Sequence, residues 1–107
     1  MTKEIVHNKL VRDKIIDIIE DVGKTANWHI AEDLEYETKL YEKVIEEVCE
    51  FKNNPSEEEA ADILEVIYSL VSYYGLNLDV IEATRKKKAE SRGSFKQKVV
   101  LESVVEA

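Results

Sequence analysis

The chain has 107 residues and a formal net charge of −8, and this length suffices for one domain with a modest hydrophobic core. The acidic balance argues against a broad nucleic-acid surface, because phosphate binding needs a basic face. The single Cys49 excludes an internal disulfide and a zinc site of several cysteines. Three glycines and one proline are too few for a turn-rich β-sandwich, so we expect one helical domain over residues 1–107.

The sequence also lacks segments that would direct the chain to a membrane. No apolar run approaches about 18 residues, the length that a membrane-spanning helix needs. The N-terminus lacks the hydrophobic stretch of a signal peptide, and the single cysteine suits a reducing compartment. We therefore expect a cytoplasmic protein without a membrane partner.

The first predicted helix runs from about Val11 to Asp21. Its apolar residues recur at i, i+3, i+4 and i+7, the spacing of one helix face: Ile15, Ile18, Ile19 and Val22. Gly23 follows where a helix C-terminus favours glycine. Because the segment is rich in β-branched residues, a strand over residues 14–19 is the competing interpretation.

The second predicted helix begins at Glu32 or Asp33, after an aperiodic loop over residues 24–32 that carries Trp28. It fades at the polar residues 52–54. Apolar residues form one stripe along it with helical spacing: Leu40, Tyr41, Val44, Ile45, Val48 and Phe51.

The third predicted helix begins after Ser56 and stops at Gly75. Ser56 is a favoured N-cap residue, and Glu59 three positions later completes a capping-box pattern. Its apolar residues cover more than half of the helical wheel, which predicts the central helix of a bundle: Ala60, Ile63, Leu64, Val66, Ile67, Tyr68, Leu70, Val71 and Tyr74.

The fourth predicted helix is capped by Asn77 or Asp79 and ends at Gly93. The segment from Phe95 to Val104 reads as an extended tail that must dock somewhere to bury its apolar side chains. The expected fold is an all-α bundle of about four helices, with a central acidic helical hairpin and a short extended C-terminal tail.

Two pairs of acids flank the turn of that hairpin. Glu47 and Glu50 share one face of the second helix, and Glu59 and Asp62 share one face of the third. An antiparallel hairpin brings the pairs together, and four acids on a partly apolar seam repel one another unless a cation lies between them. Carboxylate oxygens suit Mg²⁺. Glu46 points further outward on the wheel.

A solvated acidic surface is the competing interpretation of these acids. The chain holds 23 acids, so some pairs at i, i+3 arise by chance. A capping box also explains Glu59 without a metal. It does not explain Glu47, Glu50 and Asp62 together.

The acidic pattern resembles a known family signature. The segments Glu47–Glu50 (EVCE) and Glu59–Asp62 (EAAD) resemble the E-x-x-E…E-x-x-D motif of the all-α NTP pyrophosphatase superfamily, which includes MazG-like and phosphoribosyl-ATP pyrophosphohydrolase-like proteins. The resemblance extends to Asn8–Ile15 (NKLVRDKI), Glu46–Val48 (EEV) and Arg92–Phe95 (RGSF), and so covers nearly the whole chain. Eight residues separate the two acidic pairs, fewer than is usual in the wider superfamily.

This resemblance implies an enzyme that hydrolyses a nucleoside triphosphate between the α and β phosphates, releasing the monophosphate and pyrophosphate, as in nucleotide-pool house-cleaning. The implied cofactor is Mg²⁺, with Mn²⁺ as an alternative, and the implied ligands are Glu47, Glu50, Glu59 and Asp62. Glu46 or Glu47 would accept a proton from the attacking water. The superfamily works as dimers or dimers of dimers, so we expect a homo-oligomer. Phosphoribosyl-ATP pyrophosphohydrolase activity and a non-catalytic helical module that binds a nucleotide or a protein are the alternatives.

Six residues outside the acidic pairs are candidates for binding the substrate: Asn8, Lys9, Arg12, Lys14, Trp28 and Arg92. Arginine and lysine suit phosphate groups, an asparagine can bind a base or ribose edge, and an exposed tryptophan can stack on a base. The basic run at residues 86–88 is better explained by the dipole of its helix. Nucleic-acid binding through residues 86–92 is disfavoured by the net charge.

Overall fold

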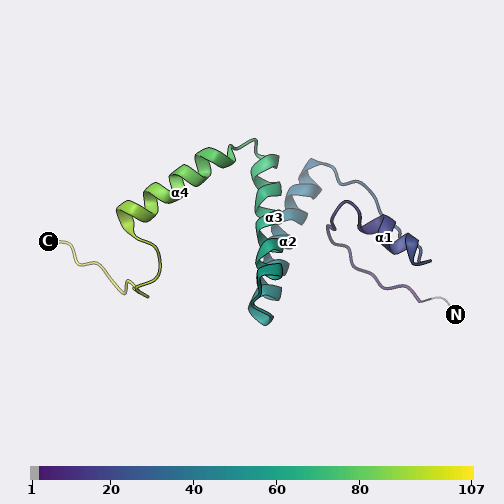
Figure 1. The fold of residues 1–107 in the computed structure, drawn as a ribbon, viewed down its shortest axis with the longest axis horizontal. Coiled ribbons are helices and arrows are strands. Elements are labelled where there is room, and N and C mark those ends of the chain that lie inside the picture. Colours follow the sequence, from purple (N-terminus) through teal and green to yellow (C-terminus); the bar gives the residue numbers. More distant parts are fainter. Residues whose placement is uncertain (1–2) are drawn as a thin grey trace. The chain divides into compact units, whose positions relative to one another are not determined.

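The computed structural model describes residues 3–107 and is helical, with no strand in that range. Figure 1 shows the four helices in chain order: α1 (Ile15–Asp21), α2 (Asp33–Asn53), α3 (Glu57–Tyr73) and α4 (Leu78–Arg92). This confirms the predicted helical class and excludes the strand considered over residues 14–19. The chain forms two compact units, one ending at Tyr74 and the other running from Gly75 to Ala107.

Helix α1 is shorter than the sequence predicted. It begins at Ile15 rather than Val11, where the Ile15 N–H donates to the Arg12 carbonyl over 3.0 Å. The residues before it are held by tertiary contacts, because Leu10 packs against the core and Arg12 pairs with Asp62 on α3. These contacts override the helical periodicity of the segment.

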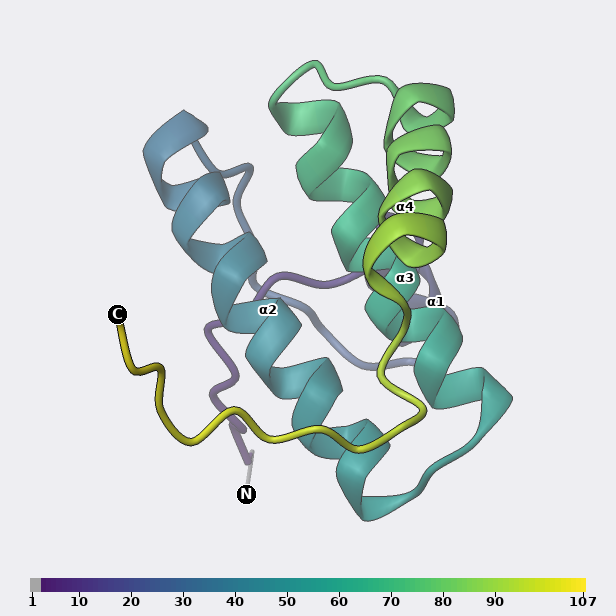
Figure 2. The same cartoon turned by 90° about the vertical axis from the view of Figure 1, so that its left-hand side faces the viewer.

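Helices α2 and α3 pack against each other as an antiparallel hairpin (Figures 1 and 2). The turn between them ends α2 at Asn54, whose N–H donates to the Glu50 carbonyl, and starts α3 at Ser56. The Ser56 Oγ accepts the Glu59 N–H over 3.2 Å, which confirms the predicted N-cap. The closed end of the hairpin thus places the end of one acidic helix beside the start of the other.

The hydrophobic core of the hairpin is small. Its buried apolar side chains are Leu40 on α2 and Val66 and Leu70 on α3, and Leu40 is only 2% exposed. Four partly buried residues pack around them: Leu10, Tyr36, Val44 and Tyr73. Leu10 comes from the N-terminal segment, so this segment covers one side of the hairpin.

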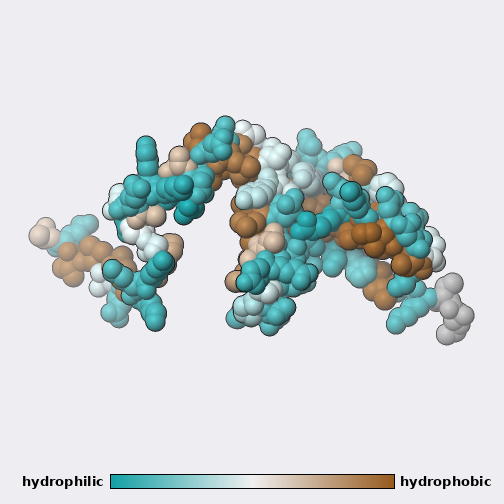
Figure 3. Space-filling view, viewed as in Figure 1, coloured by the Kyte–Doolittle hydropathy of each residue, from teal (hydrophilic) through white to brown (hydrophobic). Residues whose placement is uncertain are grey.

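A second set of apolar side chains on the hairpin stays exposed, and we refer to it as the apolar face. On α2 it consists of Tyr41, Ile45 and Val48, which recur at i, i+4 and i+7, and on α3 of Leu64, Ile67, Tyr68 and Tyr74. The hydroxyls of Tyr41 and Tyr74 lie 2.8 Å apart, which joins the two helices on this side. Figure 3 shows hydrophobic residues that reach the surface among hydrophilic ones.

The second unit contains α4 and the C-terminal segment. The Asn77 Oδ1 accepts the Val80 N–H, so Asn77 is the N-cap, and the helix ends before Gly93. The tail after it is neither helix nor strand, and its apolar side chains remain exposed, as in Phe95 at 98%. Within the second unit, the tail does not bury these side chains. No helix among residues 3–107 is long and apolar enough to span a membrane.

The small core predicts a sharp contrast between two leucines of α2. Replacing the buried Leu40 with alanine is expected to lower the free energy of unfolding by about 2–5 kcal/mol, because it leaves a cavity. Replacing Leu34, which is 81% exposed on the same helix, is expected to change it by less than about 0.5 kcal/mol. Urea unfolding at a fixed protein concentration measures both, and equal losses would contradict the assigned core.

Candidate metal centre

Three carboxylates converge at the closed end of the hairpin, and we call them the acid cluster. Glu47 and Glu50 extend from the last turns of α2, and Glu59 extends from the first turn of α3. One carboxylate oxygen of each residue lies within 4.8 Å of the corresponding oxygens of the other two. The spacing of i, i+3 on α2 puts the first two acids on one face, and the short turn brings the third opposite them.

Two oxygens of the acid cluster are buried without a hydrogen-bond partner among the described residues. They are the Oε2 atoms of Glu47 and Glu59. Glu47 is 7% exposed, so its carboxylate has lost most of its contact with water. A buried carboxylate oxygen without a partner costs free energy, and a bound cation would remove that cost. All donors at the site are hard oxygens, which fits Mg²⁺ or Mn²⁺.

The electrostatics of the acid cluster act most strongly on Glu59. Burial raises the pKa of Glu59 above its ordinary value, and repulsion from Glu50, Asp62 and Glu47 raises this pKa further. The cluster therefore destabilises its own ionised form. A divalent cation would reverse the sign of that interaction.

The capping box explains only part of the position of Glu59. In a full capping box the Glu59 carboxylate would accept the Ser56 N–H. Among the described residues only the serine half forms, and the Glu59 carboxylate faces the acid cluster instead. The N-cap hydrogen bond therefore explains the presence of Ser56, but it does not explain why the Glu59 carboxylate lies in the acid cluster.

Asp62, the fourth expected ligand, does not converge with the other three. Its Oδ1 accepts from Arg12 Nη2 at 2.7 Å, and the two side chains are partly exposed. Asp62 still lies one helical turn after Glu59, close enough to raise the pKa of Glu59. The structure thus brings three of the four expected ligands together and gives the fourth a basic partner.

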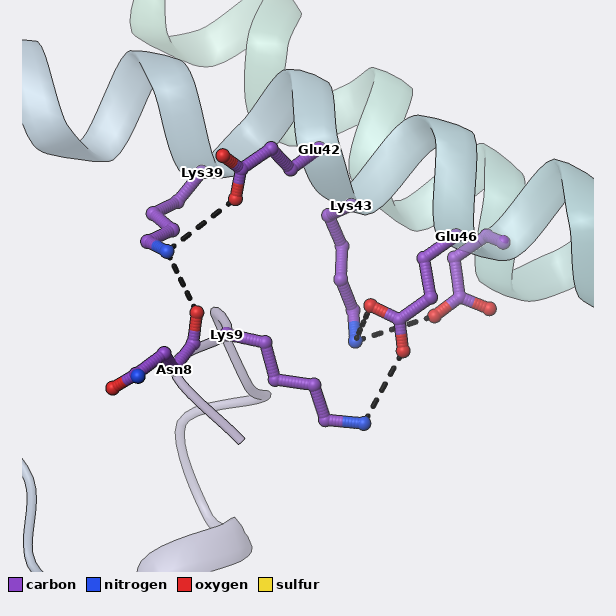
Figure 4. Close-up of polar contacts among 7 residues, drawn as sticks. Asn8, Lys9, Lys39, Glu42, Lys43 and Glu46 are labelled. Carbon is purple, nitrogen blue, oxygen red and sulfur yellow. Dashed lines mark hydrogen bonds and ion pairs between the residues drawn. The ribbon is translucent and has the colours of Figure 1, made fainter. Parts of the chain in front are cut away.

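Glu46 lies beside the acid cluster but binds lysines (Figure 4). Glu46 Oε1 lies 3.2 Å from Lys9 Nζ, and Glu46 Oε2 lies 3.2 Å from Lys43 Nζ. Partial burial alone would raise the pKa of Glu46, but the hydrogen bonds and charges of these two lysines outweigh burial and lower this pKa. A lowered pKa makes Glu46 a poorer proton acceptor.

Lys43 is a residue of this site that the sequence analysis did not single out. Its side chain is only 16% exposed, and it pairs with Glu46 and with Glu47 Oε1, the latter over 3.4 Å. The spacings of i+3 and i+4 are a signal that could have found it. Lys43 pairs with one oxygen of Glu47, and the other, Oε2, is buried without a partner among residues 3–107.

The N-terminal segment Asn8–Arg12, which we call the strap, crosses both helices of the hairpin. The Asn8 carbonyl accepts from Lys39 Nζ over 2.6 Å, and Asn8 itself has a positive φ of 46° (Figure 4). Lys9 binds Glu46 on α2, and Arg12 binds Asp62 on α3. Two of the expected substrate-binding residues, Lys9 and Arg12, therefore lie beside the acids.

The remaining expected substrate-binding residues lie on other segments of the chain. Lys14 is exposed at the start of α1, and Trp28 is 58% exposed in the loop before α2. Arg92 is the last residue of α4 in the second unit. A shallow depression at the start of α2 does not include the acid cluster, and it is lined by His29, Ile30, Glu32, Asp33, Leu34 and Glu35.

Comparison with known proteins identifies no relative of this chain. No family model, no curated protein and no solved structure matches it. The resemblance to the all-α NTP pyrophosphatases therefore depends on the motifs in the sequence, and the site is interpreted from its own geometry.

The raised pKa of Glu59 predicts how stability depends on pH. The folded state binds more protons between the unfolded and folded pKa values of Glu59, so the contribution of this residue to stability falls as pH rises through that window. Without divalent cations, Glu59→Gln is therefore expected to raise the free energy of unfolding at pH 7. This gain in the free energy of unfolding should be smaller at a pH near the ordinary carboxyl pKa of about 4.3.

Urea unfolding in a chelator at pH 7 and at pH 4 measures this effect. Glu57→Gln is the matched control, because it removes the same charge from the same first turn of α3 without touching the cluster. A loss of stability in Glu59→Gln at pH 7, relative to Glu57→Gln, would contradict the repulsion.

Proposed function

We propose that this chain is a Mg²⁺-dependent nucleoside triphosphate pyrophosphohydrolase of the all-α NTP pyrophosphatase superfamily, MazG-like in type. It would cleave between the α and β phosphates, in the cytoplasm, as a nucleotide-pool house-cleaning enzyme. The observation that supports this most is the convergence of Glu47, Glu50 and Glu59, with two buried oxygens that lack hydrogen-bond partners among residues 3–107. The family motifs in the sequence supply the substrate class.

The charge of the site determines what it can bind. The acid cluster alone repels a triphosphate, so an anionic substrate can approach it only with a cation in place. When bound, Mg²⁺ would neutralise phosphate oxygens and lower the pKa of an attacking water. Glu47, Glu50 and Glu59 would hold the ion. Lys9 and Arg12 on the strap, which pair with Glu46 and Asp62, would be the basic groups that contact the phosphates.

Of the two candidate proton acceptors, Glu47 has the better geometry. Its Oε2 is buried without a partner among residues 3–107, whereas Lys43 pairs with the carboxylate through Oε1. Glu46 is held by two lysines, and its pKa is lowered. We therefore assign the proton transfer to Glu47 and a positioning role to Glu46, through the lysines that it binds.

The proposed reaction predicts pyrophosphate release from a panel of canonical and modified nucleoside triphosphates, dependent on Mg²⁺. Glu50→Gln is expected to lower kcat/KM by at least about 100-fold, because even residues that only support a metal ligand cost 10–100-fold. Asp62→Asn is expected to lower it too, but by less, because Asp62 lies outside the convergent three.

Glu57→Gln serves as the control and is expected to keep full activity. Absence of metal-dependent turnover with every nucleotide, phosphoribosyl-ATP included, would favour a non-catalytic helical module. Activity that survives Glu50→Gln and Asp62→Asn would refute the assigned site.

We further propose that the protein is a homo-oligomer, a homodimer or a dimer of dimers, and that a second copy covers the apolar face. The hairpin buries only three apolar side chains fully and leaves Ile45 67% exposed. Two hairpins packed on their apolar faces would make a four-helix core, which a single hairpin cannot. The face has the same composition on each copy, so it suits an interface formed around a two-fold axis.

A charge placed in this face is expected to separate the copies. Light scattering on a size-exclusion column should give at least twice the chain mass for the wild type and a lower mass for Ile45→Glu. Ile30→Glu, which alters an 81% exposed isoleucine outside the face, should leave the mass unchanged. A monomeric wild type would contradict the proposal.

A further inference from the structure

The ion pair of Arg12 with Asp62 sets Asp62 apart from the acid cluster. Arg12 Nη2 lies 2.7 Å from Asp62 Oδ1. Asp62 follows Glu59 by three residues, so the two carboxylates share a face of α3. The one acid of the expected ligand set that does not converge is also the one with a guanidinium partner.

The strap has contacts with the hairpin besides the ion pair of Arg12. Leu10 packs against the core, and Lys9 pairs with Glu46 on α2. The strap is therefore anchored on the hairpin even when the Arg12 side chain moves. The side chains of Arg12 and Asp62 are 57% and 32% exposed, and partly exposed ion pairs of this kind contribute little net stability.

The acid cluster next to this pair has the properties of a cation site. The Glu47 side chain is nine-tenths buried, and its Oε2 has no hydrogen-bond partner among residues 3–107. One carboxylate oxygen of Glu47 lies within 4.8 Å of oxygens of Glu50 and Glu59. An ion of charge two placed among the three acids would attract a fourth carboxylate one turn away. The same ion would repel a guanidinium at that carboxylate.

We infer that Asp62 exchanges its Arg12 partner for the divalent cation when the site is loaded, and that Arg12 is thereby released to bind a phosphate group. This inference rests on the proposed function. It gives Arg12 two roles in succession: it balances the charge of Asp62 in the metal-free protein, and it becomes a phosphate ligand in the loaded one. Binding of the cation and of a phosphate would then favour each other, because the first frees the ligand of the second.

Affinity for Mn²⁺ alone, measured by calorimetry without nucleotide, tests the exchange. Arg12→Gln is expected to bind Mn²⁺ about two- to fivefold more tightly than the wild type, the range that an exposed ion pair allows. Lys24→Gln is the matched control, because it removes the same charge from a side chain without an ion pair among residues 3–107, and it should leave the affinity unchanged.

A double-mutant cycle separates the exchange from a general effect of charge. In an Asp62→Asn background, Arg12→Gln should no longer tighten Mn²⁺ binding, because no carboxylate is left to exchange. Arg12→Lys provides a second variant if Arg12→Gln is unstable, and it should tighten binding by less, since the charge remains but the 2.7 Å contact is lost.

Unchanged or weaker Mn²⁺ binding in these Arg12 variants, or equal tightening in the Asp62→Asn background, would overturn the inference and leave the proposed function standing. A wild type that binds no Mn²⁺ would instead remove the proposed function and the inference with it. The two failures are therefore distinguishable.

Discussion

Repulsion among partly desolvated carboxylates is the constraint on which the site depends. Packing α2 against α3 buries Glu47 and turns Glu59 toward it, and burial together with neighbouring acids raises the pKa of Glu59. Basic residues balance the charge around the cluster but not at its centre. Lys43 binds one oxygen of Glu47, Arg12 binds Asp62, and the Oε2 atoms that remain have no partner among residues 3–107. A divalent cation bound among these carboxylates would offset their mutual repulsion.

The hydrophobic core of the hairpin that carries this site is small. Only a few apolar side chains are fully buried, and the strap contributes Leu10 to cover one side of the hairpin. Within the first unit, the apolar face of the hairpin stays exposed, whereas apolar side chains are usually buried in a core. In the proposed assembly, a second copy on this face would stiffen both helices that carry the acids.

Much of the fold was predictable from local signals. The caps Ser56 and Asn77 and the periodicity of α2 and α3 placed three helices within a residue or two of the observed bounds. The start of α1 was not predictable, because tertiary contacts of the strap hold the residues before Ile15. The sequence placed Glu47 on the partly apolar seam of the hairpin, and Glu47 is buried there. The pairing of Asp62 depends on a residue 50 positions earlier, which no local pattern reveals.

The central claim is that the acid cluster, rather than the acidic surface as a whole, binds a divalent cation. Paramagnetic broadening of backbone amide signals by substoichiometric Mn²⁺ tests this most directly. We expect signals near residues 47–50 and 59–62 to broaden first, while the acidic segment at the start of α2, residues 32–37, keeps its intensity. Equal broadening along all acidic segments would contradict it, because the ion would then be bound diffusely by surface charge.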